Sequence, residues 1–210
     1  MRNVVVLFII GLLSFPCKSE TPKDEKIQAV VSVYKVYNSL ELMEKVNTVI
    51  SENDSVGQLI VTDLAKANGY LPVVETKDTA MVREYVAKLD FDKPTTCAFI
   101  PLNSPTGEDF NSIIVYEQAP LISETVTLAI APNEYQEYEA LFKFADADKW
   151  ERITQENVGR QLALAVNGVI RSAPTVATPI KGGSCSVVGP DLDKLLKLSK
   201  DLIRNRNAYN

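Results

Sequence analysis

The sequence of 210 residues contains no histidine and only three cysteines. Without histidine, the chain has no Ser-His-Asp or Cys-His nucleophile system, no imidazole general base and no zinc site that needs a His ligand. Three cysteines are too few for a Cys₄ zinc site. Hydrophobic residues make up 46% and charged residues 23%, which is typical of globular proteins. The composition therefore predicts a folded chain of one domain, or one with a smaller companion.

Long hydrophobic runs are also scarce, and the longest extends from Val4 through Phe15 after the positive charge of Arg2. It is too short to cross a bilayer but has the length of a signal-peptide core. We therefore predict a signal peptide over residues 1–19, export to the periplasm or cell envelope, and a flexible charged lead-in over 20–26. A buried N-terminal strand of an intracellular protein is the alternative.

The charge balance of the mature chain is acidic. Without residues 1–19 the chain has 20 basic and 27 acidic residues, a net charge of −7. This balance argues against nucleic acid as the main partner, because such proteins present basic surfaces to phosphates.

The three cysteines leave two questions open. Cys17 directly follows the apolar run, so it is a possible lipidation site that would tether the chain to a membrane through its N-terminus. Cys97 and Cys185 form a possible disulfide in an oxidising compartment, and two separate buried thiols are the alternative.

Periodicity and turn residues predict an irregular alternation of strands and helices. Strands are predicted at 27–37, 72–75, 97–102, 112–117, 124–131, 138–144, 161–166, 169–176 and 184–188. Helices are predicted from Ser39 to about Ile50, from Thr79 to about Leu89, from Lys149 to Val158 and from Pro190 onward. The segment 58–67 is ambiguous. With these hairpin-joined strands we expect an α+β fold with a mostly antiparallel sheet packed with helices.

Local signals define the ends of these elements. The predicted helix caps are Ser39, Asp78, and either Asp146 or Asp148. The predicted apolar side of the third helix consists of Trp150, Ile153 and Val158. Asn167-Gly168 predicts a type I′ hairpin, because both central residues of that turn need a positive φ. Lys181 to Ser184 predicts a second turn.

No pattern in the sequence predicts chemistry. The chain has no nucleophile with a base in sequence reach and no metal cluster, so we predict no catalytic, metal or cofactor-binding residues and no enzyme activity. Acidic pairs such as Glu108/Asp109 are expected in loops and helix caps. The minority alternatives are an aromatic patch at Tyr135 and Tyr138, a partner site on the basic side of the last helix, and an enzyme that uses Asp and Tyr residues.

The segment from Trp150 to Gly189 resembles the signature of SecD, the accessory subunit of the bacterial Sec protein-export channel. That family carries a helix ending in EN[VI]G, a D-G or N-G hairpin, an SAP element, and P-I-x-G-G-S before a closing glycine. The matching motif residues here are Glu156, Asn157, Val158, Gly159, Asn167, Gly168, Ser172, Ala173, Pro174, Pro179, Ile180, Gly182, Gly183, Ser184 and Gly189. A weaker similarity extends upstream through residues 77–89 and 119–130.

The resemblance implies a SecD periplasmic head-like domain over residues 69–210, preceded by an unassigned strand-helix region over 27–68. It implies a structural role for the motif residues and binding of an unfolded exported chain or an envelope partner, without cofactors. The family's transmembrane helices have no counterpart here, and Asn167 stands where Asp is usual. The alternative is an envelope lipoprotein that acts as an adaptor and has no role in export.

Overall fold

The computed structural model describes residues 25–50, 57–58, 73–74, 79–102, 110–132 and 138–188. Several sequence predictions lie outside these residues. They are the signal peptide, Cys17, the cap at Asp78, the last helix, Gly189, Tyr135, the Glu108/Asp109 pair and nearly all of the segment 58–67.

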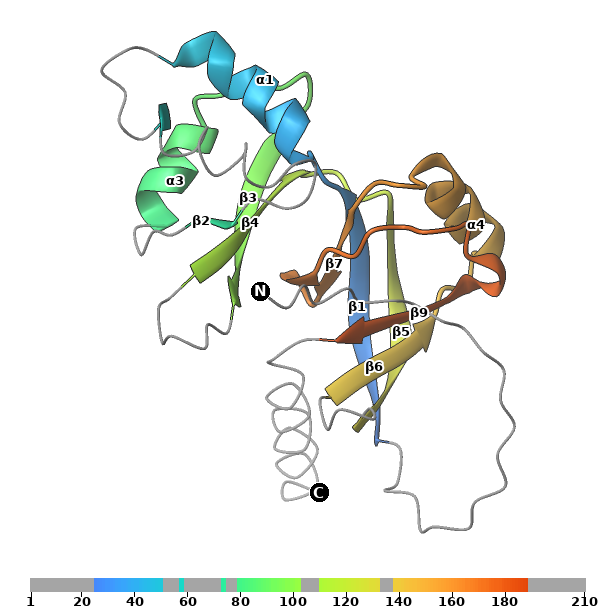
Figure 1. The fold of residues 1–210 in the computed structure, drawn as a ribbon. Helices are drawn as coiled ribbons and strands as arrows, with labels where there is room; N and C mark the ends of the chain where they lie inside the picture. Colours follow the sequence, from blue (N-terminus) through green and yellow to red (C-terminus); the bar gives the residue numbers. More distant parts are fainter. Residues whose placement is uncertain are drawn as a thin grey trace, which may run out of the picture. The chain divides into compact units, whose positions relative to one another are not determined.

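The described residues form two antiparallel sheets together with α-helices (Figure 1). The helices are α1 (Ser39–Val49), α3 (Thr79–Val86) and α4 (Ala147–Glu156), and a 3₁₀ turn η1 covers Lys181–Gly183. The strands are β1 (Glu25–Lys35), β2 (Val73–Val74), β3 (Thr95–Leu102), β4 (Phe110–Glu117), β5 (Ile122–Pro132), β6 (Tyr138–Lys143), β7 (Leu162–Val166), β8 (Val169–Ser172) and β9 (Ser184–Val188). The larger sheet has the order β8-β7-β1-β5-β6-β9 and the smaller one β2-β4-β3. The prediction of an α+β fold with a mostly antiparallel sheet is confirmed.

The chain divides into two compact units. The first unit comprises Met1–Ala29, Thr125–Gly159 and Val176–Asn210. The second unit comprises Val30–Glu124 and Arg160–Thr175. Each unit therefore combines segments that are far apart in the sequence.

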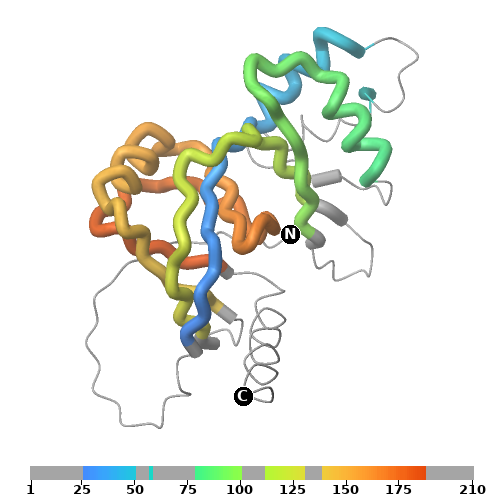
Figure 2. Tube along the Cα trace, turned by 180° about the vertical axis from the view of Figure 1, so that it is seen from behind, coloured from blue at the N-terminus to red at the C-terminus, as the bar shows by residue number. Residues whose placement is uncertain are grey.

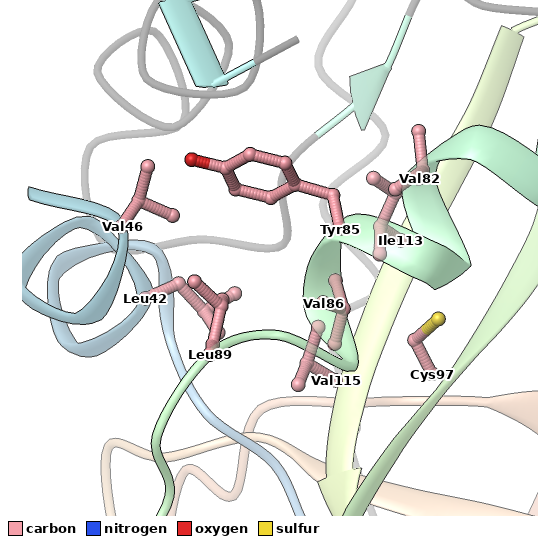
Figure 3. Packing of buried hydrophobic residues seen from close by; sticks show 9 residues of the cluster. All are labelled: Leu42, Val46, Val82, Tyr85, Val86, Leu89, Cys97, Ile113 and Val115. Carbon is pink, nitrogen blue, oxygen red and sulfur yellow. The ribbon is translucent and has the colours of Figure 1, made fainter. Parts of the chain in front are cut away.

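In the second unit, α1 and α3 pack with the β3–β4 pair around one hydrophobic cluster (Figure 3). The buried members of the cluster are Leu42, Val46, Val82, Tyr85, Val86, Leu89, Cys97, Ile113 and Val115. The predicted helical stripe at positions 82, 85, 86 and 89 is therefore in the core. The helix itself ends at Val86, and Leu89 joins the cluster from the turn that follows.

The predicted cap of α1 at Ser39 is wrong, because Ser39 is the first residue of the helix and is fully buried. The cap is Asn38, whose Oδ1 accepts hydrogen bonds from the N–H groups of Leu40 and Glu41. The Glu41 carboxylate accepts a hydrogen bond from the Asn38 N–H and completes a capping box. Asn and Ser are equally good caps, so sequence preference did not distinguish the two neighbours.

In the first unit, β6 and the part of β5 from Thr125 onward bury alternate residues, so each strand has one exposed face. Asp146 caps α4, because its carboxylate accepts a hydrogen bond from the N–H of Lys149. Of the two predicted candidates, Asp146 and not Asp148 is therefore the cap. Trp150 and Ile153 are buried as predicted. The prediction for Val158 is wrong, since its side chain is 48% exposed. The helix ends at Glu156, so Val158 no longer follows the helical spacing that would bury it.

Candidate functional site

The end of α4 carries the first part of the predicted motif, and its residues close the helix. Asn157 is the C-cap, and its Nδ2 donates a hydrogen bond to the carbonyl of Ile153 at 2.8 Å. Gly159 follows with φ of 78°, and its N–H donates to the carbonyl of Val176 at 2.8 Å. The glycine thus allows the left-handed turn that an L side chain rarely adopts. The motif terminates the helix and ties it to the segment that enters η1.

Thr154 joins α4 to that same segment. Its Oγ1 accepts a hydrogen bond from the N–H of Ile180 at 2.9 Å and donates back to the helix at the Trp150 carbonyl. Thr154 is fully buried, so this hydroxyl satisfies a backbone donor in a place that water does not reach. α4 and η1 consequently lie side by side (Figure 2).

The predicted turn at Lys181 to Ser184 is confirmed as η1, in which Gly182 has φ of 73° and Gly183 has φ of 78°. Gly183 is buried, and its carbonyl accepts a hydrogen bond from the N–H of Phe144 at 3.0 Å. A Cβ atom at Gly183 would lie 2.6 Å from the Phe144 carbonyl oxygen. Only glycine fits here without a shift of the backbone.

The Asn167-Gly168 hairpin has the predicted geometry, with φ of 50° and 79° at its two central residues. Asn167 also makes two hydrogen bonds to a distant strand that the sequence did not predict. Its Oδ1 accepts a hydrogen bond from the N–H of Val30, and its own N–H donates to the Val30 carbonyl. The hairpin tip is therefore fastened to β1 within the second unit.

The SAP element follows this hairpin, and β8 ends earlier than the predicted strand 169–176. The pairing of β7 with β8 shifts between Leu164 and Ala165, and β8 ends at Ser172. Ala173 packs on the cluster of Val36, Ile114 and Ala163, and the Pro174 carbonyl accepts a hydrogen bond from Leu162. The pairing continues past the shift at Leu164–Ser172, and the isolated Gln161–Thr175 bridge lies in the same register. The strand is interrupted between these pairs, where Pro174 has no N–H to donate to the ladder.

A buried carboxylate in the second unit also escaped prediction. Glu117 is 4% exposed, and its Oε2 accepts a hydrogen bond from Lys93 Nζ at 2.8 Å, while Lys35 Nζ lies 3.5 Å from Oε1. The hydrogen bond to Glu117 raises the pKa of the Lys93 ammonium. The two lysines lie far from Glu117 in sequence, so no local pattern signals the pair. Both lysine side chains are partly exposed and reach the buried carboxylate from the surface, and these ion pairs indicate a structural role.

The two cysteines of the described residues are free thiols. Cys97 is buried in the cluster of the second unit, and Cys185 lies on β9 in the first unit. Burial raises the pKa of the Cys97 thiol, an effect that Arg83 partly opposes. Burial raises the pKa of the Cys185 thiol to about 12. Because the thiolate is the reactive form, neither group is set up as a nucleophile.

We expect both thiols to resist alkylation in the folded chain. At pH 8 an ordinary thiol is partly ionised, whereas a group titrating near 12 is almost entirely protonated, so iodoacetamide should modify Cys185 at least about a hundredfold more slowly than in the unfolded chain. Peptide mass spectrometry after timed labelling, with and without guanidinium, measures the two rates separately. Equal rates in both conditions at either cysteine would contradict the assignment.

The exposed face of the first-unit sheet carries neutral groups beside the charged Lys26, Glu139 and Lys143. Gln28 Nε2 donates a hydrogen bond to Thr127 Oγ1 at 2.6 Å, and Leu141 on β6 is 50% exposed. Ser186 on β9 is paired with Leu141, so the two side chains share this face. This face therefore combines hydrogen-bonding side chains with an exposed apolar one.

The described ranges contain no set of three or more His, Cys, Asp or Glu side chains that could hold a metal ion. None of their helices is long and apolar enough to cross a membrane. The motif residues that the structure describes close helices and turns, so they maintain a fold.

Comparison with known proteins finds a family match for part of this chain. Residues 103–194 match the family model of the SecDF P1 head subdomain. The protein translocase subunit SecD of Syntrophobacter fumaroxidans is 32% identical over 88 residues, which are 40% of this chain and 16% of that protein. The chain thus corresponds to a small part of that relative's length.

Two solved structures of SecDF are also similar to this chain. One, described as a membrane component SecDF that enhances protein export, aligns over 78% of this chain and 86% of its own, at 17% identity and a TM-score of 0.31. The other, SecDF in its super-membrane-facing form, aligns over 77% of this chain and 26% of its own, at 16% identity and the same TM-score. The family match covers the motif-bearing segment, so the predicted resemblance to the SecD periplasmic head is confirmed for residues 103–194.

Proposed function

We propose that this chain is a non-catalytic accessory of protein export that contacts unfolded polypeptides or the Sec machinery outside the cytoplasm. The observation that carries the proposal is the match of residues 103–194 to the SecDF P1 head subdomain. Residues 1–19 would direct export as a signal peptide, and Cys97 and Cys185 would remain unpaired structural thiols.

The chemistry of the described residues supports a binding role. The motif residues of this chain close turns and helices. The exposed sheet face of the first unit presents neutral groups such as Thr127, Leu141 and Ser184. A protein that holds many different unfolded chains needs contacts that do not depend on one sequence, and such contacts need no reactive side chain.

A photocrosslinking experiment in cells tests this function. A photoreactive amino acid at Leu141, on the exposed sheet face, should recover exported chains or Sec components. The same photoreactive amino acid placed at Val49 serves as the control, because Val49 is 42% exposed on α1 and lies outside the matched segment. Recovery of neither class of protein from Leu141, or equal recovery from both positions, would contradict the proposal.

A further inference from the structure

Sheet edges present unpaired backbone groups with which another strand could pair. Three of the four edges in the described residues carry features that hinder such pairing. On β3, Arg83 Nη1 donates a hydrogen bond to the Cys97 carbonyl at 2.7 Å, and Pro101 has no N–H to offer. β8 is short and has a register shift, and β2 has only two residues. These devices prevent a further strand from pairing.

The fourth edge, β9, has none of these devices. Its sequence is SCSVV, without a charged residue, proline or glycine, and its pairing with β6 runs without a register shift over the whole strand. Among the described residues, no strand pairs with its outer side.

The register shows which groups point outward. The N–H of Phe144 donates to the Gly183 carbonyl, so these two residues form a hydrogen-bonded pair. In an antiparallel ladder every second pair is hydrogen-bonded, so the next such pairs are Phe142 with Cys185 and Ala140 with Val187. The residues between them, Ser184, Ser186 and Val188, therefore direct their N–H and C=O groups away from β6. One of these carbonyls, that of Ser186, receives a weak contact from Cys185 Sγ at 3.7 Å.

We propose that the outer edge of β9 is a strand-addition site, where an extended segment of another polypeptide pairs through its backbone. This inference rests on the proposed function and specifies where and how an unfolded chain would bind. Backbone pairing reads no particular sequence, and the neutral Ser184 and Ser186 side chains exclude few partners. Leu141, beside Ser186 on the same face, adds an apolar contact.

The size of the edge favours a transient partner over a second copy of this chain. A strand of this length buries far less than the roughly 1,200 Å² of a stable protein interface. Two β9 edges pairing alone would therefore not hold a dimer, whereas a weak contact is suited to a chain that must be released.

Hydrogen exchange gives a direct test in the full chain. The probe is ribonuclease A kept unfolded by reduction and carboxymethylation of its cysteines. On binding, the amides of Ser184, Ser186 and Val188 should become protected, whereas those of Cys185 and Val187 are protected beforehand by β6. This alternation is the signature of an added strand, and uniform or absent protection across β9 would overturn the inference.

A variant pair supplies the second test. Ser186→Pro removes an outward N–H without removing a bond to β6, and it should weaken binding of the probe at least about tenfold. Ser186→Thr keeps that N–H and should bind as the unchanged chain does. Circular dichroism checks the fold, and hydrogen exchange of the unchanged chain decides the matter if Ser186→Pro does not fold.

The outcomes separate the two proposals. If the unchanged chain binds the probe but Ser186→Pro binds equally well, β9 is not the site and the binding function stands. If the probe does not bind at all, polypeptide binding and the β9 site both fail. Protection of the β9 amides without any probe would show that another segment or a second copy occupies the edge, and would also overturn the inference.

Discussion

Replacing Gly183 with alanine should lower the free energy of unfolding by about 3 kcal/mol. Two costs combine at this position. The backbone has a positive φ that L side chains rarely adopt, and the new Cβ would lie 2.6 Å from the Phe144 carbonyl oxygen. That oxygen belongs to the residue directly after β6, whose own N–H is hydrogen-bonded to the Gly183 carbonyl, so it has little freedom to move. Chemical denaturation of the full chain measures the change.

Gly182 is a matched control for this variant, because it is the adjacent residue and also has a positive φ. Nothing lies within 4 Å of a Cβ atom built there, so Gly182→Ala should cost only the backbone term of about 1 kcal/mol. If the two alanine variants are equally destabilised, the close approach to Phe144 does not decide the effect.

Replacing Phe144 with alanine should cost about 3–5 kcal/mol, the largest effect that we expect from a single substitution. The side chain is fully buried in the first unit. Its ring lies 4.9 Å from that of Trp150 and 5.4 Å from that of Phe142, measured between centroids. Alanine would leave a cavity between these rings, because neither a strand nor a capped helix can move in to fill it.

Leu141→Ala provides the comparison for that loss. Leu141 lies on the strand just before Phe144 but is half-exposed, so its truncation should change the free energy of unfolding by no more than about 0.5 kcal/mol. Thermal or chemical unfolding of both variants, monitored by tryptophan fluorescence, measures the difference. Similar costs for the two would show that the ring cluster does not form the core of this unit.

Local steric rules predicted several features of this protein from sequence. The Asn167-Gly168 turn and the end of α4 at Gly159 depend on the backbone freedom of one or two neighbouring residues. The buried side of α3 follows from the helical spacing of Val82, Tyr85 and Val86. The same local rules failed where neighbours were equivalent, as with the caps Asn38 and Ser39.

The candidate site was predictable only in outline. The order of the motif residues indicated a SecD head-like domain, and the family match confirmed it. Their roles became visible only in the structure, where Asn167 fastens a hairpin to Val30 and Gly183 approaches Phe144. Each of these contacts joins residues that are far apart in the chain, and a single sequence contains no signal for such pairs.

The amino-acid sequence by itself determined where this chain turns, which helix faces are apolar and which family its C-terminal half resembles, because these properties depend on a residue and its near neighbours. Only the tertiary structure decided that Lys35 and Lys93 pair with a buried Glu117, that Arg83 covers the β3 edge, and that no strand in the described residues pairs with the outer side of β9. Strand order and ion pairing depend on which distant segments meet, and that is settled by the burial of the whole core.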